Sequence, residues 1–237
     1  MSLTSEAVLH SPGRQPIDSR IASRDAARFL VVLDVDSTLI ENEVIEMLAQ
    51  AAGSFAEVAE ITERAMSGEL DFEQSLRSRV ATLEGLDVAQ LPDIAQQIRL
   101  TPGAQQMIDT LHANDSVVGV VSGGFHELLD ELAGDVGLDF WRANRLDVRE
   151  GRLTGAVLGP VIDAEAKASA LVEWASAYGV PRSRTVAVGD GANDLQMMKT
   201  AGLSVAFDAR PVVRRSANVA ISDRDLSQVL PALGLRG

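Results

Sequence analysis

Short runs of apolar residues recur along the chain and predict the strands of a sheet. Three of them, FLVVL (29–33), SVVGVV (116–121) and TVAV (185–188), are almost wholly apolar. Runs of this length without alternation are typical of strands buried on both faces of a parallel sheet. Polar turns and helix-like segments separate the runs, so strand, turn and helix alternate as in α/β folds. We therefore predict an α/β protein with a Rossmann-like, doubly wound parallel sheet and right-handed crossovers.

The sequence also predicts several helices and two further short strands. Helices are predicted from Pro102 to His112, from Phe125 to Ala133 and from Ala164 to Tyr178, and short strands at 203–207 and 219–221. Two runs of mixed polar and apolar residues, 145–149 and 152–156, flank Glu150-Gly151. This arrangement predicts a β-hairpin.

The stretch from 41 to 100 has a different pattern. Apolar residues recur at helical spacing, for example within 44–51, and glycines divide the stretch without strand-like alternation. The sequence thus predicts a small all-helical cap, residues 41–100, inserted after the first strand. The α/β core would comprise 27–40 and 101–237, and residues 1–26 would form a loosely ordered extension.

Composition and charge narrow the choice of partners. The chain has 237 residues, a formal net charge of -13, 23% charged residues and no cysteine. No stripe of Lys and Arg is present to bind a phosphate backbone, so we expect no nucleic-acid partner. No apolar stretch approaches the roughly 20 residues that cross a bilayer, and residues 1–24 lack a secretory apolar core, so we expect a cytoplasmic protein without a membrane partner. The oligomeric state cannot be predicted.

Polar, glycine-containing segments follow three of the predicted strands, at 34–38, 122–124 and 189–194. Because the carboxyl ends of parallel strands meet at one edge of a sheet, these segments should converge. The carboxylates among them are Asp34, Asp36, Asp190 and Asp194. Close carboxylates repel one another unless a cation lies between them, and oxygen ligands without His or Cys favour Mg²⁺.

The remaining groups suit a phosphate. The backbone N–H groups of 122–124, at a predicted helix start, and the Ser122 hydroxyl could bind phosphate oxygens. Lys167 could contact both a phosphate and a carboxylate. Asp34 would then be placed to attack phosphorus, and Asp36, two residues later, to protonate the leaving alcohol and afterwards activate water.

Each segment also has an ordinary structural interpretation. The acids and hydroxyls of 34–38 could cap a helix, and 189–194 could be a glycine-rich turn with an Asn or Asp cap. Turns such as 122–124 are common, and a lysine such as Lys167 on an amphipathic helix usually faces solvent. Their joint occurrence in this order favours the functional interpretation.

The motifs DVDST (34–38), VVSGG (120–124), Lys167 and GDGAND (189–194) resemble, in this order, the four motifs of haloacid dehalogenase-type phosphatases. Within that superfamily, longer stretches are similar to the phosphoserine phosphatase family. They are AMSGELDFEQSLRSRV (65–80), VVSGGF (120–125), ANRLDVREGRLTG (143–155) and VAVGDGANDLQM (186–197). The resemblance covers almost all of the chain after Ala26.

This resemblance implies roles for the core residues. Asp34 would be the nucleophile and a Mg²⁺ ligand, and Asp36 the acid and base, with its backbone carbonyl on the metal. Asp190 would be a further metal ligand, and Asp194 would support the metal site from behind the ligands. The implied phosphate-binding or substrate-binding residues are Ser122, Gly123, Lys167 and Asn193.

In the cap, the resemblance implies that Glu43 faces a substrate ammonium group and Arg79 its carboxylate. Met66 and Phe72 would shield the pocket. The ordinary interpretation is an exposed ion pair for the first two and plain core packing for the others.

The function implied is Mg²⁺-dependent hydrolysis of O-phospho-L-serine through an aspartyl-phosphate, the last step of serine biosynthesis. Two alternatives stay open. One is a phosphatase or phosphotransferase that acts on another small phosphate, such as phosphothreonine or phosphohomoserine. The other is a non-catalytic, phosphate-binding regulatory protein of the same fold.

Overall fold

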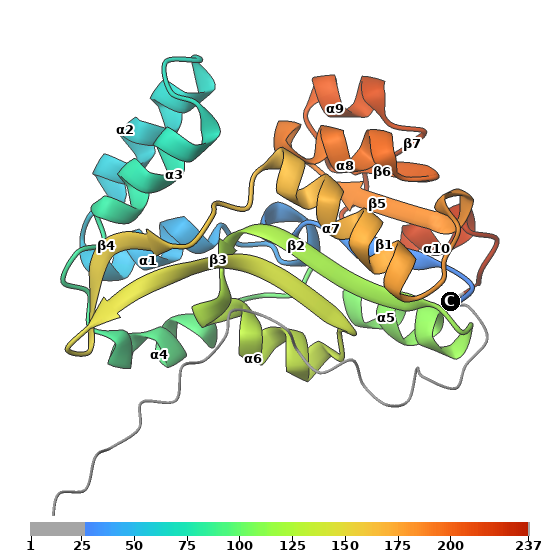
Figure 1. The fold of residues 1–237 in the computed structure, drawn as a ribbon, viewed down its shortest axis with the longest axis horizontal. Helices are drawn as coiled ribbons and strands as arrows, with labels where there is room; N and C mark the ends of the chain where they lie inside the picture. The colour runs from blue at the N-terminus through green and yellow to red at the C-terminus, as the bar shows by residue number, and fades with distance from the viewer. Residues whose placement is uncertain (1–26, 237) are drawn as a thin grey trace, which may run out of the picture.

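One seven-stranded sheet organises the computed structural model, which describes residues 27–236. The strand order is β4-β3-β2-β1-β5-β6-β7, and every neighbouring pair is parallel except β3 and β4 (Figure 1). The strands are β1 (Leu30–Leu33), β2 (Val117–Phe125), β3 (Phe140–Arg149), β4 (Arg152–Leu158), β5 (Thr185–Gly189), β6 (Leu203–Phe207) and β7 (Val219–Ile221). The extension predicted at 1–26 lies outside the described residues.

The central strand β1 is buried on both faces, as its apolar run predicts. All four of its side chains are 0% exposed. Because side chains alternate across a strand, Val31 and Leu33 pack into one apolar cluster and Leu30 and Val32 into the other. The sheet is therefore covered on both faces.

Helices cover these two faces and complete the doubly wound α/β fold that the sequence predicts. Those on the Val31 side are α5 (Ala104–Ala113), α6 (His126–Val136) and α10 (Val229–Ala232). Those on the Leu30 side are α7 (Ala164–Ala177), α8 (Leu195–Thr200) and α9 (Pro211–Ser216). Short 3₁₀ turns lie at Val88–Gln90, Arg182–Arg184, Ala192–Asp194 and Leu226–Gln228.

The segment 41–100 is helical, as its periodicity predicts. It contains α1 (Val44–Ala52), α2 (Phe55–Met66), α3 (Phe72–Ala81) and α4 (Leu91–Ala95). The chain enters and leaves the segment side by side, because Ile40 bridges Leu100 and the Glu41 N–H donates to the Arg99 carbonyl at 2.9 Å. We refer to residues 41–100 as the cap segment; its division from the core as a separate domain remains a prediction.

The prediction of a turn at 122–124 is wrong. β2 continues through these residues to Phe125, and α6 begins at His126 rather than at Phe125. The segment remains extended but leaves the regular ladder, since the register between β2 and β3 shifts between Val121 and Phe125. A glycine-rich polar sequence is compatible with a bulged strand as well as with a turn, so local sequence does not distinguish the two.

The predicted hairpin is present, although its first strand is longer than expected. β3 starts at Phe140 and pairs with β2 before it turns into the hairpin with β4. Glu150 and Gly151 have φ values of 50° and 76°, and positive values at both central residues are the mark of a type I′ turn.

Gly119 of β2 allows β3 to approach closely. A β-carbon at this position would overlap the ring of Phe140. That ring packs against Trp174 and Tyr178 of the α7 region, with ring centroids 4.4 and 5.3 Å away. Glycine is therefore required here by packing between the sheet and α7.

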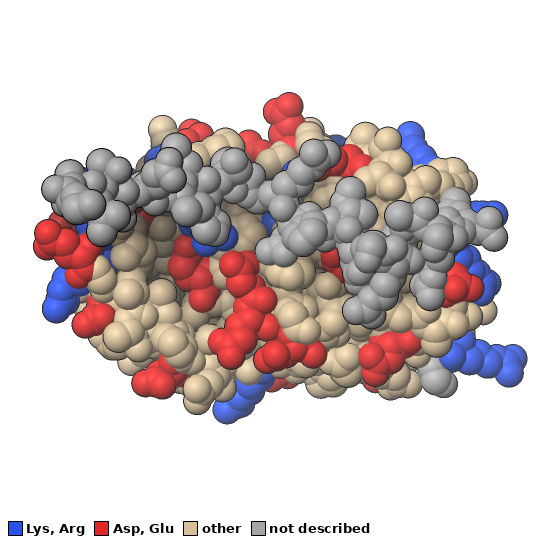
Figure 2. All heavy atoms as spheres, turned by 60° about the horizontal axis from the view of Figure 1, so that its bottom comes forward, with Lys and Arg blue, Asp and Glu red and all other residues tan. Residues whose placement is uncertain are grey.

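The surface shown in Figure 2 has acidic side chains near its middle and basic ones mostly toward its ends. Within residues 27–236, no helix combines the length and the apolar character that crossing a bilayer requires.

Candidate active site

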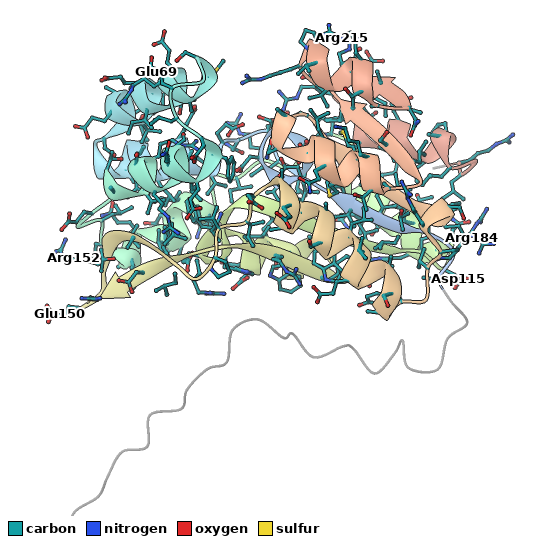
Figure 3. All side chains as sticks on the ribbon, turned by 45° about the horizontal axis from the view of Figure 1, so that its top comes forward. Glu69, Asp115, Glu150, Arg152, Arg184 and Arg215 are labelled. Carbon is teal, nitrogen blue, oxygen red and sulfur yellow. The ribbon has the colours of Figure 1, made fainter. Side chains whose placement is uncertain are left out.

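The polar strand ends converge at the carboxyl edge of the sheet. In Figure 3, Asp115 and Arg184, which precede β2 and β5, mark the amino edge of the sheet. Glu69 of the cap segment and Arg215 of α9 lie away from that edge. The parallel register places the ends of β2, β1 and β5 next to one another, since Leu33 pairs with both Val120 and Val188. Three segments distant in sequence thus form one site, as predicted.

Asp34 and Lys167 form the buried centre of this site. Lys167 of α7 is 0% exposed, and its Nζ lies 2.7 Å from Asp34 Oδ1 and 2.7 Å from Asp194 Oδ1. The Val35 N–H donates to the same Asp34 Oδ1 at 2.7 Å, which fixes the carboxylate. The two carboxylates raise the pKa of Lys167 and outweigh the lowering effect of burial, the largest single contribution. Lys167 is therefore a buried cation, and the ordinary alternative, a lysine that faces solvent, is wrong.

Asp190 and Asp194 extend the carboxylate cluster. One oxygen from each of Asp34, Asp190 and Asp194 lies within 4.8 Å of the other two. Burial, and then the charge of Asp34, raise the pKa of Asp190 to about 6, although the Thr38 hydroxyl donates to it at 3.2 Å. Burial also raises the pKa of Asp194. The charge of Asp34 adds to the effect of burial at both groups, and close carboxylates that repel one another mark a candidate cation site.

The donor set fits Mg²⁺, because it consists of carboxylate oxygens without nitrogen or sulfur. Asp194 has both oxygens occupied, one by Lys167 and the other by the Gly191 N–H at 3.0 Å. A β-carbon at Gly189 would overlap the Asp194 carboxylate, so the glycine leaves the space that this side chain fills. These contacts suit Asp194 for support of the metal site and leave Asp34 and Asp190 as the better candidate ligands.

Asp36 lies on a tight turn after β1. The next residue, Ser37, has a φ of 57°, which reverses the chain toward the cap segment. Asp36 Oδ1 accepts from the Val44 N–H at 3.2 Å, and a β-carbon at Gly124 would lie 3.3 Å from Oδ2. Burial, followed by the charges of Glu43 and Asp34, holds the pKa of Asp36 well above its usual range. The protonated form that a general acid needs is thereby favoured.

The bulged segment 122–124 provides the phosphate-binding candidates. Ser122 is buried, and its hydroxyl oxygen accepts from the Gly124 N–H at 2.7 Å. A β-carbon at Gly123 would lie 3.1 Å from the ring of Phe72, so this cap residue covers the strand end. The shielding role of Phe72 remains a prediction.

Glu43 and Arg79 face the site from the cap segment. The Ser37 hydroxyl donates to Glu43 Oε1 at 2.7 Å, and burial raises the pKa of Glu43. Burial lowers the pKa of Arg79, while the charges of Glu43 and Asp36 act in the opposite direction. Among residues 27–236, the Arg79 guanidinium forms no ion pair within 4.0 Å; its Nε donates to the Ser75 carbonyl at 3.3 Å. Its remaining N–H groups are available to a ligand.

The roles predicted for Met66 and Asn193 are not decided by their contacts. Met66 is 63% exposed at the end of α2, and its sulfur lies 3.8 Å from a guanidinium nitrogen of Arg210 on the core. Its shielding role remains a prediction. Asn193 lies in the 3₁₀ turn after Gly191, near the carboxylate cluster, and its substrate-binding role also remains a prediction.

The sequence interpretation missed some supporting residues. Ser37 and Thr38, which follow Asp34 as simple hydroxyls in the sequence, donate to Glu43 and Asp190. The Asn144 side chain donates to the Gly123 carbonyl at 2.8 Å. The available signal for Asn144 was its place in the stretch 143–155, which resembles the phosphoserine phosphatase family.

Comparisons with known proteins agree with this geometry. The family model described as haloacid dehalogenase-like hydrolase matches residues 31–199. A phosphoserine phosphatase of Streptomyces coelicolor is 54% identical over 209 residues, 88% of this chain and 51% of that protein. Another, of Streptococcus thermophilus, is 49% identical over 204 residues, 86% of this chain and 95% of that protein. The chain thus spans about half the length of the first relative and nearly all of the second.

The fold is also similar to a solved structure described as a phospho-aspartyl intermediate analogue of phosphoserine phosphatase. The TM-score is 0.82 at 42% sequence identity, and the match covers 89% of this chain and 100% of the other.

Proposed function

This chain belongs to the haloacid dehalogenase-like hydrolase family, and we propose that it hydrolyses O-phospho-L-serine to serine and phosphate in a Mg²⁺-dependent reaction. The observation on which this rests is the pairing of Asp34 with the buried Lys167 directly beneath a cap segment that presents Glu43 and Arg79. The names of the relatives support the same substrate, and in serine biosynthesis this hydrolysis would be the last step.

The chemistry uses two aspartates in separate roles. Asp34 attacks phosphorus and forms an aspartyl-phosphate, while the bond from phosphorus to the serine oxygen breaks. Asp36, whose pKa is raised, gives its proton to the departing serine oxygen. The Asp36 carboxylate then takes a proton from water, which attacks the aspartyl-phosphate and releases phosphate and the free Asp34.

Fixed positive groups stabilise the charge on the transferring phosphoryl group. Lys167 is already charged and immobilised by two carboxylates, so it needs no reorganisation when charge develops. The N–H groups and hydroxyl of segment 122–124, together with Asn193, would hold the other phosphate oxygens. Asp34, Asp190 and the Asp36 carbonyl would hold the metal, with Asp194 behind them, and Mg²⁺ would supply Lewis-acid stabilisation of phosphoryl charge when bound.

The cap segment would select the substrate. A phosphate site alone accepts many esters, whereas one carboxylate and one guanidinium together match the ammonium and carboxylate of a free amino acid. Glu43 is held in place by Ser37, and Phe72 closes the space above Gly123. We therefore expect free phosphoserine to be preferred over sugar phosphates and phosphopeptides.

The test is a panel of phosphate esters with purified protein and Mg²⁺, in which phosphate release is measured. Phosphoserine should have the highest kcat/KM, chelator should abolish turnover, and radiolabelled phosphate should be trapped on wild type but not on Asp34→Asn. Preference for phosphothreonine, phosphohomoserine or a sugar phosphate would contradict the substrate, and transfer of the label to an added alcohol would indicate a phosphotransferase. No turnover of any ester would favour a phosphate-binding regulatory protein. The cytoplasmic location and the lack of nucleic-acid and membrane partners remain predictions.

A further inference from the structure

The bulge in β2 creates an unusual backbone position at the phosphate-binding segment. Val121 pairs with Arg142 and Phe125 pairs with Asn144, so the three residues of 122–124 face the single residue between them on β3. The insertion takes the segment out of the ladder. Its backbone groups then need partners other than the neighbouring strand, because buried carbonyls are rarely left without a hydrogen bond.

Asn144 supplies one of these partners and joins two parts of the site. It is 1% exposed; its Nδ2 donates to the Gly123 carbonyl at 2.8 Å, and its Oδ1 accepts from the Ile162 N–H at 2.9 Å. Ile162 precedes Asp163, the N-cap of α7, and the Asp163 carbonyl accepts from the Lys167 N–H at 2.9 Å. One buried amide thus connects the phosphate-binding segment with the start of the helix that holds the catalytic lysine.

We propose that Asn144 is a positioning residue for phosphoryl transfer, which sets the placement of Gly123 relative to Lys167; the proposal rests on the proposed function of this site. A buried strand position normally favours an apolar or β-branched residue. An amide suits this position because its donor binds the phosphate-binding segment, and its acceptor binds Ile162 just before α7, the helix that carries Lys167. Misplacement of such elements by about 1 Å is enough to lower the rate about 100-fold.

Two substitutions separate the bonds. Asn144→Asp can still accept from Ile162 but cannot donate to the Gly123 carbonyl, and Asn144→Leu removes both interactions at similar volume. Leu146→Ala is the matched control, because Leu146 lies two residues further along β3, is 2% exposed and has its side chain in the apolar cluster. It should destabilise the protein without altering the two connections.

The experiment combines kinetics on phosphoserine, thermal unfolding, and calorimetric titration with inorganic phosphate in the presence of Mg²⁺, all well below the unfolding range. We expect Asn144→Asp to lower kcat by about 10-fold to 100-fold and to weaken phosphate binding by about 10-fold, while Leu146→Ala unfolds at lower temperature but keeps kcat and phosphate affinity within about twofold. If Asn144→Leu does not fold, Asn144→Asp decides the matter.

Two outcomes would overturn the proposal. One is an Asn144→Asp protein with wild-type kcat and phosphate affinity, and the other is an equal loss of both quantities in Leu146→Ala. If wild type does not hydrolyse phosphoserine, the proposed function fails. The phosphate titration then still tests Asn144, since selective weakening in Asn144→Asp supports the positioning role and equal affinities contradict it.

Discussion

Replacing Asp190 with asparagine should stabilise the metal-free protein although it removes a proposed metal ligand. Asp190 lies in the carboxylate cluster, where burial and the neighbouring Asp34 raise its pKa from 3.8 to about 6. The charged form is thus less stable in the folded protein than in the unfolded chain. The asparagine side chain would keep an oxygen that can accept the hydrogen bond from Thr38 but would have no charge.

The size of this stabilisation and its pH dependence follow from the raised pKa of Asp190. A rise of about 2 pKa units at about 1.4 kcal/mol per unit is about 3 kcal/mol, and solvent around this half-buried group reduces the gain to the order of 1 to 3 kcal/mol. Because the folded pKa is raised, the folded state binds the proton more tightly than the unfolded chain. Stability therefore falls as pH rises from 3.8 to about 6 and remains reduced above that range.

The assay is thermal unfolding by circular dichroism in the presence of chelator, at pH about 4 and about 7.5. Asp190→Asn should melt about 3 to 10 °C above wild type at the higher pH and close to it at the lower pH. Asp223→Asn, at an exposed position outside the site, should melt like wild type at both. Adding Mg²⁺ should raise the melting temperature of wild type more than that of Asp190→Asn. A variant no more stable than wild type at pH about 7.5, or equally stabilised at both pH values, would refute the reasoning.

Other predictions concern the cap segment, the sheet and a surface histidine. Arg79→Ala should lower kcat/KM for phosphoserine by about 100-fold but leave an aryl phosphate nearly unchanged, whereas Arg77→Ala, which removes an exposed ion pair, should affect neither; equal losses on both substrates would make Arg79 structural. Gly119→Ala should lower the free energy of unfolding in urea by about 1 to 3 kcal/mol, because the added β-carbon would overlap the ring of Phe140. Gly134→Ala, in a helix with open space around it, should raise the free energy of unfolding by about 0.5 to 1 kcal/mol. The pKa of His112 is raised by its hydrogen bond to a carboxylate, so its contribution is present below pH 6.5 and is lost as pH rises through the raised pKa; His112→Gln should cost stability at pH about 6 and little at pH about 9.

Much of the fold was predictable because parallel sheets impose a simple pattern. A strand buried on both faces must be apolar throughout, and the run at 29–33 accordingly marks β1, the centre of the sheet. The bounds of β6 and β7 also follow from short apolar runs. The bulge at 122–124 was not predictable in this way, because its extended conformation depends on β3 and on the Asn144 side chain rather than on local preference.

The site was predictable where chemistry concentrates in short motifs. Acids that directly follow strands of a parallel sheet lie at its carboxyl edge, so the convergence of Asp34 and Asp190 followed from topology. Lys167 was different. A lysine on a helix usually faces solvent, and only the three-dimensional structure explains how this one is buried, through carboxylates that follow β1 and β5.

In the proposed reaction, the charges of the core and of the cap segment would recognise different parts of the substrate. In the cap segment, Glu43 and Arg79 carry opposite charges, as do the ammonium and carboxylate of an amino acid, so these two ligand groups would add no net charge to this half of the site. In the core, three clustered carboxylates face Lys167, the only buried lysine or arginine among residues 27–236. A phosphate dianion would enter this excess of negative charge, which opposes its binding. A divalent cation removes that excess, so we infer that the metal governs affinity for the phosphate group, whereas the cap segment governs the choice among phosphate esters.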